Sequence, residues 1–362
     1  MDAVPSAFVF SLMDSLLTSD PFRNLGHAKE LGRGYGRIAR EVHKAATICS
    51  IETPGVFFTT SCDDDCVFLK PPVFKGMLSG GARSPPVMKN LVELIVFAQN
   101  LFFEGDEPST EGTSMREMRT LIGKCRHVRV RELEVGHFPA VQSSFTLLPD
   151  FTTFFNKVSL RYQKTDSFRE FLVALVEGKK LESLQLDALE LKNSEAMLLE
   201  TSPHQWLQET ILKAFFQPQL RELKLSDFHY WASHALFDFL LQKWLSTPET
   251  FPETTKLLEV WRAPPIDLLR TSGFGSKGQI RRDKEFMLPV RSFLLPHPES
   301  LERTVEIEVF GALAYSKINI DAVTDDEFFK GAFFSRIRFR FNRGENAMYW
   351  RNKRTTPIPL VS

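Results

Sequence analysis

The glycines between residues 273 and 278 are the first place where residue type and spacing could do chemistry. Gly273, Gly275 and Gly278 spell G-x-G-x-x-G, the spacing by which dinucleotide-binding proteins bring backbone N–H groups to a pyrophosphate. Such a site needs a strand before the glycines and a helix after them. The preceding Leu268–Arg270 gives no strand signal, and residues 279–284 are charged. The motif therefore predicts a flexible loop and no cofactor.

Two cysteines and two histidines have spacings that suggest a metal site. Cys62 and Cys66 flank three aspartates, but a structural zinc ion takes four ligands, usually from two close pairs. The sequence offers no second pair of cysteines or histidines at a suitable spacing. His229 and His234 stand five positions apart, which does not bring two imidazoles together on one helix face. We interpret the cysteine segment as a hairpin turn and assign no metal ligand.

Motifs of known catalytic machinery are missing from the sequence. It contains no nucleophile elbow, no protein-kinase set and no H-E-x-x-H. Because no acid, base, nucleophile or metal set converges, we expect no catalytic residue and a protein that is not an enzyme. A remote alternative is an enzyme whose site is covered by the long insert 262–300.

Arginines alternate with apolar residues near the C-terminus. Arg336, Arg338 and Arg340 interleave with Ile337 and Phe339, so on a strand the arginines point to one face and the apolar residues to the other. One interpretation is a patch for an acidic partner or phosphate. The other is an edge strand that its charges protect from pairing with further strands.

Composition excludes several classes of protein. Among 362 residues, Lys+Arg and Asp+Glu each number 45, so no overall charge favours nucleic acid or an anionic membrane. Four cysteines are too few for a disulfide scaffold. No signal peptide is evident, and no apolar run reaches the ~18 residues of a membrane-spanning helix. We expect a cytoplasmic or nuclear protein that does not interact with membranes.

A short apolar pattern, the apolar ladder, recurs eight times. In each copy apolar residues stand at positions i, i+3 and i+5, with mainly polar residues between them, as a half-buried strand requires. Helical patterns lie between several copies, with apolar faces such as Phe168, Phe171 and Leu175. The copies begin at Leu91, Cys125, Phe155, Leu181, Leu220, Thr255, Thr304 and Phe334.

Repeated strand-and-helix units predict the fold class. We expect an α/β protein, an irregular leucine-rich-repeat-like solenoid of parallel strands with helical crossovers. A small all-helical segment, residues 1–45, precedes it, and its last helix is expected to place Tyr35, Ile38 and Val42 on one face. Residues 46–90 form a connector of short strands and loops, 91–345 the repeat domain with the insert 262–300, and 346–362 a basic tail.

The N-terminal segment, together with the repeats, resembles the nematode F-box-associated families. The resemblance rests on the outline MDxVPxxFxxxLxxxL, followed by short helices and irregular leucine-rich repeats. It implies that the apolar residues of the outline dock on an adaptor of a cullin–RING ubiquitin ligase, while the repeats hold a substrate. The docking residues implied are Val4, Pro5, Phe8, Leu12, Leu16 and Leu17.

Two functions therefore stay open beside the remote enzyme. The first is a non-enzymatic protein-interaction protein, an F-box-like substrate receptor that binds its adaptor through residues 1–45. The second is a repeat scaffold without a ligase role, in which residues 1–45 cap the repeats, as solenoid ends require.

Overall fold

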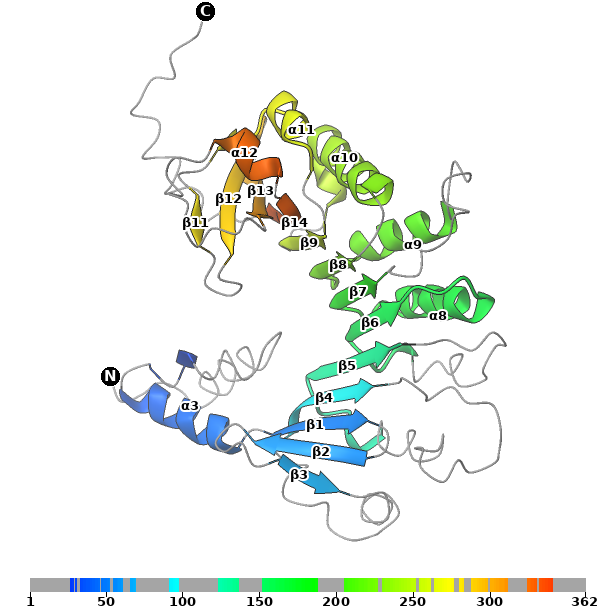
Figure 1. Ribbon diagram of the computed structural model, residues 1–362. Helices are drawn as coiled ribbons and strands as arrows, with labels where there is room; N and C mark the ends of the chain where they lie inside the picture. The colour runs from blue at the N-terminus through cyan, green and yellow to red at the C-terminus, as the bar shows by residue number, and fades with distance from the viewer. Residues whose placement is uncertain are drawn as a thin grey trace, which may run out of the picture. The chain divides into compact units, whose positions relative to one another are not determined.

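A computed structural model of the chain divides into two compact units, Met1–Leu181 and Glu182–Ser362, which we call unit 1 and unit 2 (Figure 1). The boundary falls inside the range 91–345 that the sequence indicated as one repeat domain. The structure describes residues 27–28, 30, 33–45, 47–52, 55–60, 66–69, 91–97, 123–136, 152–187, 205–226, 230–251, 254–261, 264–276, 280–282, 288–298, 300–311, 324–330 and 332–340.

Unit 1 is built on one mixed sheet. Its strands follow the order β6-β5-β4-β1-β2-β3. The pairs β1·β4, β4·β5 and β5·β6 are parallel, whereas β1·β2 and β2·β3 are antiparallel. The elements are α3 (Arg33–Ala45), β1 (Thr47–Glu52), β2 (Gly55–Thr60), β3 (Cys66–Leu69), β4 (Leu91–Phe97), β5 (Val130–Val135), β6 (Lys157–Arg161) and α8 (Asp166–Glu177).

Unit 2 carries a second set of strands, in the order β10-β12-β13-β14-β9-β8-β7, with β11 also paired to β12. Strands β7, β8 and β9 are parallel, and all the other pairs are antiparallel. The elements are β7 (Ser183–Asp187), α9 (Gln205–Phe215), β8 (Glu222–Ser226), α10 (Tyr230–Ser246), η3 (Pro248–Thr250), β9 (Lys256–Val260), α11 (Ile266–Thr271), β10 (Gly275–Ser276), β11 (Arg281–Arg282), β12 (Pro289–His297), β13 (Ser300–Gly311), α12 (Asp325–Lys330) and β14 (Ala332–Arg340).

The apolar ladder is confirmed as the pattern that fills the core. In all eight copies the second and third residues are at most 2% exposed. The alternate residues of β6, β7 and β8 are only partly buried, as expected when one face of a sheet packs and the other does not. The α/β class and its parallel strands with intervening helices are therefore borne out.

The expected helical faces pack on the same side as the ladder. Helix α8 buries Phe168, Phe171 and Leu175, and its N-cap Thr165 accepts a hydrogen bond from the backbone N–H of Phe168. In unit 2, α9 and α10 both lie on one face of the strands (Figure 1), and Trp244 of α10 is fully buried.

The prediction of a parallel array through residue 345 is wrong in its last part. Strands β13 and β14 hold the ladders at 304 and 334, yet they pair antiparallel with each other, and β14 also pairs antiparallel with β9. The described part of the insert 262–300 is not a loop, since it forms α11, β10, β11 and β12. Side-chain alternation is the same in parallel and antiparallel strands, so the ladder could not reveal strand direction.

The glycine motif marks the end of helix α11. Gly273 has φ of +83°, a left-handed conformation that favours glycine. Its N–H donates to the carbonyl of Arg270, and the N–H of Phe274 donates to that of Leu269, which is a Schellman C-cap. Gly275 lies in β10, and Gly278 lies outside the described residues.

Helix α3 confirms the third helix expected in residues 1–45, and its described buried residues are not on the expected apolar face. Gly36 and Ala39 are buried, whereas Ile38 is 36% exposed and Val42 is half-buried. The buried side of this helix carries small residues, which a search for large apolar residues does not detect. The side chain of Tyr35 lies outside the described part of the chain.

Asn156 joins two parallel strands of unit 1 at their amino ends. Its side-chain oxygen accepts the N–H of Arg131 at 2.9 Å, and its amide nitrogen donates to the carbonyl of Arg129 at 2.8 Å. Its own N–H donates to the carbonyl of Arg131 at 3.0 Å. The side chain thus satisfies backbone groups of the neighbouring segment, from which it is separated by about 25 residues of chain.

We expect Asn156→Ala to destabilise unit 1 by about 2 kcal/mol, because a part-buried N–H and a carbonyl lose their partners. Hydrogen exchange followed by mass spectrometry should show faster exchange in peptides that contain β5 and the start of β6. Ser159→Ala, on the outward face of β6, is the control and should leave exchange unchanged. Equal exchange in the two variants would contradict the assigned role.

Candidate functional site

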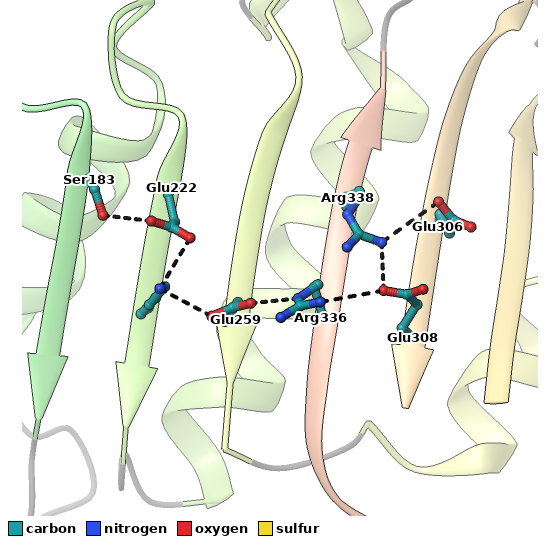
Figure 2. A network of polar contacts seen from close by, with 8 residues as sticks. Ser183, Glu222, Glu259, Glu306, Glu308, Arg336 and Arg338 are labelled. Atoms are coloured by element: carbon teal, nitrogen blue, oxygen red, sulfur yellow. Dashed lines mark hydrogen bonds and ion pairs between the residues drawn. The ribbon is translucent and has the colours of Figure 1, made fainter. Parts of the chain in front are cut away.

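A network of charged side chains lies on the face of unit 2 opposite helices α9 and α10. Figure 2 shows it on the near face of the strands, with helices behind them. It runs across β8, β9, β14 and β13, and the signs of the charges alternate. We call it the charge network; its members are Glu222, Lys224, Glu259, Arg336, Arg338, Glu306 and Glu308.

The central row of the network follows strand register. Glu308, Arg336, Glu259 and Lys224 are successive cross-strand partners on β13, β14, β9 and β8. Arg336 Nε donates to Glu259 Oε1 at 2.6 Å, and its Nη1 lies 4.0 Å from Glu308 Oε2. Lys224 Nζ lies 3.7 Å from Glu259 Oε2. Opposite charges on facing residues stabilise neighbouring strands, so this row favours the observed register of the four strands.

A second row extends the network at both ends. Arg338 Nη1 donates to Glu308 Oε2 at 2.6 Å and lies 4.0 Å from Glu306 Oε2. On the other side, Glu222 accepts from the hydroxyl of Ser183 at 2.8 Å and lies 3.2 Å from Lys224 Nζ. Every charge in the network thus has an opposite charge within 4.0 Å.

The side chains of the network on β9, β14 and β13 are more buried than those on β8. Side-chain exposure is 35% at Lys224 and 29% at Glu222, but 10% at both Arg336 and Glu259 and 6% at Glu308. Burial alone lowers the pKa of Lys224, but the carboxylates of Glu222 and Glu259 outweigh it, so this pKa lies above its ordinary value. The two carboxylates therefore stabilise the protonated, ammonium form of Lys224.

The predicted arginine patch is only partly described. Arg336 and Arg338 project from one face of β14, as their alternation predicted, but both bind carboxylates of this chain. The idea of an edge strand is wrong, because β14 is paired on both sides, by β13 and by β9. Arg340 also lies in β14, and its side chain is outside the described residues.

The predicted docking residues lie outside the described part of the chain. Val4, Pro5, Phe8, Leu12, Leu16 and Leu17 are all among residues 1–26. The cysteine segment is described only in part: β2 and β3 pair antiparallel, which confirms the hairpin, while Cys62 and residues 63–65 are not described.

Apart from the charge network, the described residues offer few groups that could bind a ligand or react. No group of three or more histidine, cysteine or acidic side chains that could hold a metal ion occurs among them. Cys125 is fully buried, and burial raises the pKa of its thiol to about 12 although Lys124 opposes this. Within the same residues, no helix has the length and apolar character to cross a membrane.

Lys256 is a buried cation on the opposite, core-facing side of β9. It is 1% exposed, and its Nζ donates to the carbonyls of Gln217 and Leu220, which lie in the turn between α9 and β8. Burial, and after it the nearby charge of Arg221, lowers its pKa to about 8. The side chain of Lys256, the first residue of β9, thus links this strand to the turn that follows α9.

Stability of unit 2 should rise with pH because of Lys256. The folded-state pKa of about 8 lies below the ordinary 10.5, so between these values the unfolded chain binds more protons. The free energy of unfolding should therefore increase by about 3 kcal/mol from pH 8 to above 10.5. The neutral amine keeps two N–H donors, so both carbonyl bonds survive deprotonation.

Urea unfolding at several pH values, with tryptophan fluorescence as the signal, tests this expected rise in stability. All five tryptophans lie beyond residue 181, so the signal reports on unit 2. Lys256→Met should lose the alkaline increment, whereas Lys330→Met, at an exposed position on α12, should retain it. Identical pH profiles for Lys256→Met and the natural chain would rule out this origin.

Sequence reasoning missed both the partners of the arginines and the role of Lys256. Glu259 lies 77 residues before Arg336, and no local pattern links such positions. The signal that was present is the alternation of Glu306 and Glu308 with apolar residues on β13, which mirrors the arginines of β14. Comparison with known proteins finds no matching family model, no matching curated protein and no matching solved structure.

Proposed function

We propose that this chain is a non-enzymatic protein-interaction protein, whose βα units are an irregular leucine-rich-repeat-like framework for recognition. The observation that supports this most is the separation of the two faces of β7 and β8. Leu184 and Leu223 are fully buried on the helix side, while polar residues on the other face remain half-exposed. A framework of this kind leaves one face free to vary without cost to the core.

The finer proposal is an F-box-like substrate receptor of a cullin–RING ubiquitin ligase. Its support is the sequence outline at residues 4–17 alone. Affinity capture with the full-length chain tests it against the double variant Phe8→Asp, Leu12→Asp. We expect the natural chain to retain the adaptor and the cullin and the double variant to lose both. If the natural chain retains neither, the ligase role is excluded.

The alternative is a repeat scaffold in which residues 1–45 cap the repeats and have no ligase role. Helix α3 supports a capping contribution, because Gly36 and Ala39 are buried. A truncation of residues 1–32 keeps α3 and separates the two ideas. A scaffold cap predicts a lower melting temperature on truncation, whereas a detachable docking segment predicts an unchanged melting curve and lost capture.

The remote alternative is an enzyme whose site is covered by the insert 262–300, the described part of which forms a helix and strands. Hydrogen exchange of this segment with a panel of nucleotides still tests it. We expect no change in protection, and ordering by one nucleotide would revive an enzymatic role.

A further inference from the structure

The carboxyl ends of helices α9 and α10 come together at two aromatic rings and one lysine. Lys243 lies in the last turn of α10. Its Nζ is 4.8 Å from the ring centre of Phe216 and 6.0 Å from that of Phe239. Phe216 directly follows α9, and its N–H donates to the carbonyl of Leu212. We call Phe216, Phe239 and Lys243 the ring–lysine patch.

The two rings of the patch are held to different degrees. Phe216 is half-buried, and its ring packs edge-on against those of Phe215 and Phe251, with ring centres 5.7 and 5.1 Å away. Phe239 is 43% exposed, one of the described large apolar side chains left at the surface. Aromatic residues, phenylalanine included, are enriched where proteins contact partners, because each ring can bury a large apolar area.

The charge of Lys243 is turned toward rings and not toward carboxylates. In the part of the chain that the structure describes, its ammonium contacts the two rings and forms no ion pair. The carboxylates nearest along the chain belong to Asp238 and Glu249, which are exposed and also form no ion pair among the described residues. Cation–π attraction restricts the lysine, so less side-chain entropy is lost when a carboxylate pairs with it than for a freely moving surface lysine.

We propose that the ring–lysine patch binds an acidic segment of a partner protein, with a carboxylate paired to Lys243 and an apolar side chain against Phe239. Positive charge and exposed apolar area lie side by side here, so the patch matches a segment in which acidic and apolar residues are interspersed. This inference rests on the proposed function as an interaction protein, and it adds the chemistry of a partner that binds on the helix side of unit 2.

A nucleic acid is the less suitable occupant of this patch. Binding to a phosphate backbone depends on many cation–phosphate contacts and on a clustered positive charge. The ring–lysine patch offers one cation, and the chain as a whole has no net charge. One carboxylate is sufficient to pair with one lysine, whereas the apolar area of Phe239 requires an apolar neighbour on the partner.

Fluorescence anisotropy with labelled probes tests the proposal on the full chain. The first probe is a peptide that repeats glutamate, leucine and glycine, and the second has lysine in place of each glutamate. The third is a single-stranded oligothymidine. We expect the glutamate peptide to bind and the other two probes not to bind. Lys243→Met and Phe239→Ala should each raise the Kd by about fivefold, through loss of an exposed ion pair or of an apolar contact.

Matched variants separate the patch from general effects of exposed residues. Lys243→Arg keeps the charge, Lys330→Met removes an exposed charge on α12, and Trp261→Ala removes an aromatic side chain that is 51% exposed. All three should leave the Kd within about twofold of that of the natural chain, because sites that share no contact do not couple. A melting curve for each variant confirms that it is folded.

Three outcomes would overturn the inference: no binding of the glutamate peptide, binding of the lysine peptide or the oligonucleotide, or equal weakening by the patch variants and the controls. Failure here differs from failure of the proposed function. If affinity capture retains specific proteins while the glutamate peptide does not bind, the chain is an interaction protein with another partner chemistry. If both experiments fail, the proposed function fails with the inference.

Discussion

Replacement of Arg336 by methionine should lower the free energy of unfolding of unit 2 by about 3 kcal/mol, because it leaves buried carboxylates without their principal cation. Arg336 is bonded to Glu259 at 2.6 Å, with both side chains 10% exposed. Its guanidinium also lies 5.5 Å from the ring centre of Phe310. The loss should lie near the lower end of the range for buried pairs, because Glu259 keeps Lys224 and Glu308 keeps Arg338.

Urea unfolding followed by tryptophan fluorescence measures this loss in unit 2. Arg270→Met is the matched control: Arg270 is 53% exposed and lies 3.8 Å from Asp267 on α11, and an exposed pair contributes at most about 1 kcal/mol. The double variant Arg336→Met, Glu259→Gln should recover part of the lost stability by removing the unpaired charge. Equal losses for Arg336→Met and Arg270→Met would show that the network does not stabilise unit 2.

Replacement of Phe339 by alanine should have a comparable or larger effect, about 3–5 kcal/mol. Phe339 of β14 is fully buried, and its ring centre lies 5.8 Å from that of Phe215 of α9 and 5.4 Å from that of Phe251. The ring centre of Phe251 also lies 5.1 Å from that of Phe216. The alanine variant would leave a cavity at the centre of an aromatic cluster that joins a helix to the sheet.

Phe239→Ala is the control for this variant, since it removes the same side chain from a position 43% exposed, where about 1 kcal/mol or less is expected. Phe339→Leu should fall between the two, because leucine refills part of the cavity. The same fluorescence measurement applies. A loss below about 1 kcal/mol for Phe339→Ala would mean that the aromatic cluster repacks around the cavity.

The positions of the strands and their buried faces could be predicted from this sequence. Leu184 and Leu186 on β7, like Ile337 and Phe339 on β14, alternate with polar residues, and each is fully buried. Alternation is a property of one strand, so it is visible in a single short segment. The same alternation placed Arg336 and Arg338 on the face opposite Ile337.

Pairing and strand direction could not be predicted in this way. The ladders at Leu220 and Phe334 have the same spacing, yet β8 pairs parallel with its neighbours and β14 antiparallel. Likewise, the strands of the insert 262–300 are short or flanked by glycine and proline, so the sequence pattern did not reveal them as strands. Their place in the sheet depends on pairing, since β12 pairs with β13, and β10 and β11 pair with β12.

The sequence by itself therefore determined which face of each strand enters the core, and it determined that the arginines of β14 share one face. Only the tertiary structure decided what those arginines contact. Glu308 and Glu259 reach Arg336 from strands that are distant along the chain, and they do so in register. The physical reason is that alternation arises from local backbone geometry, whereas the partner of a charge depends on which strands pair and in what register.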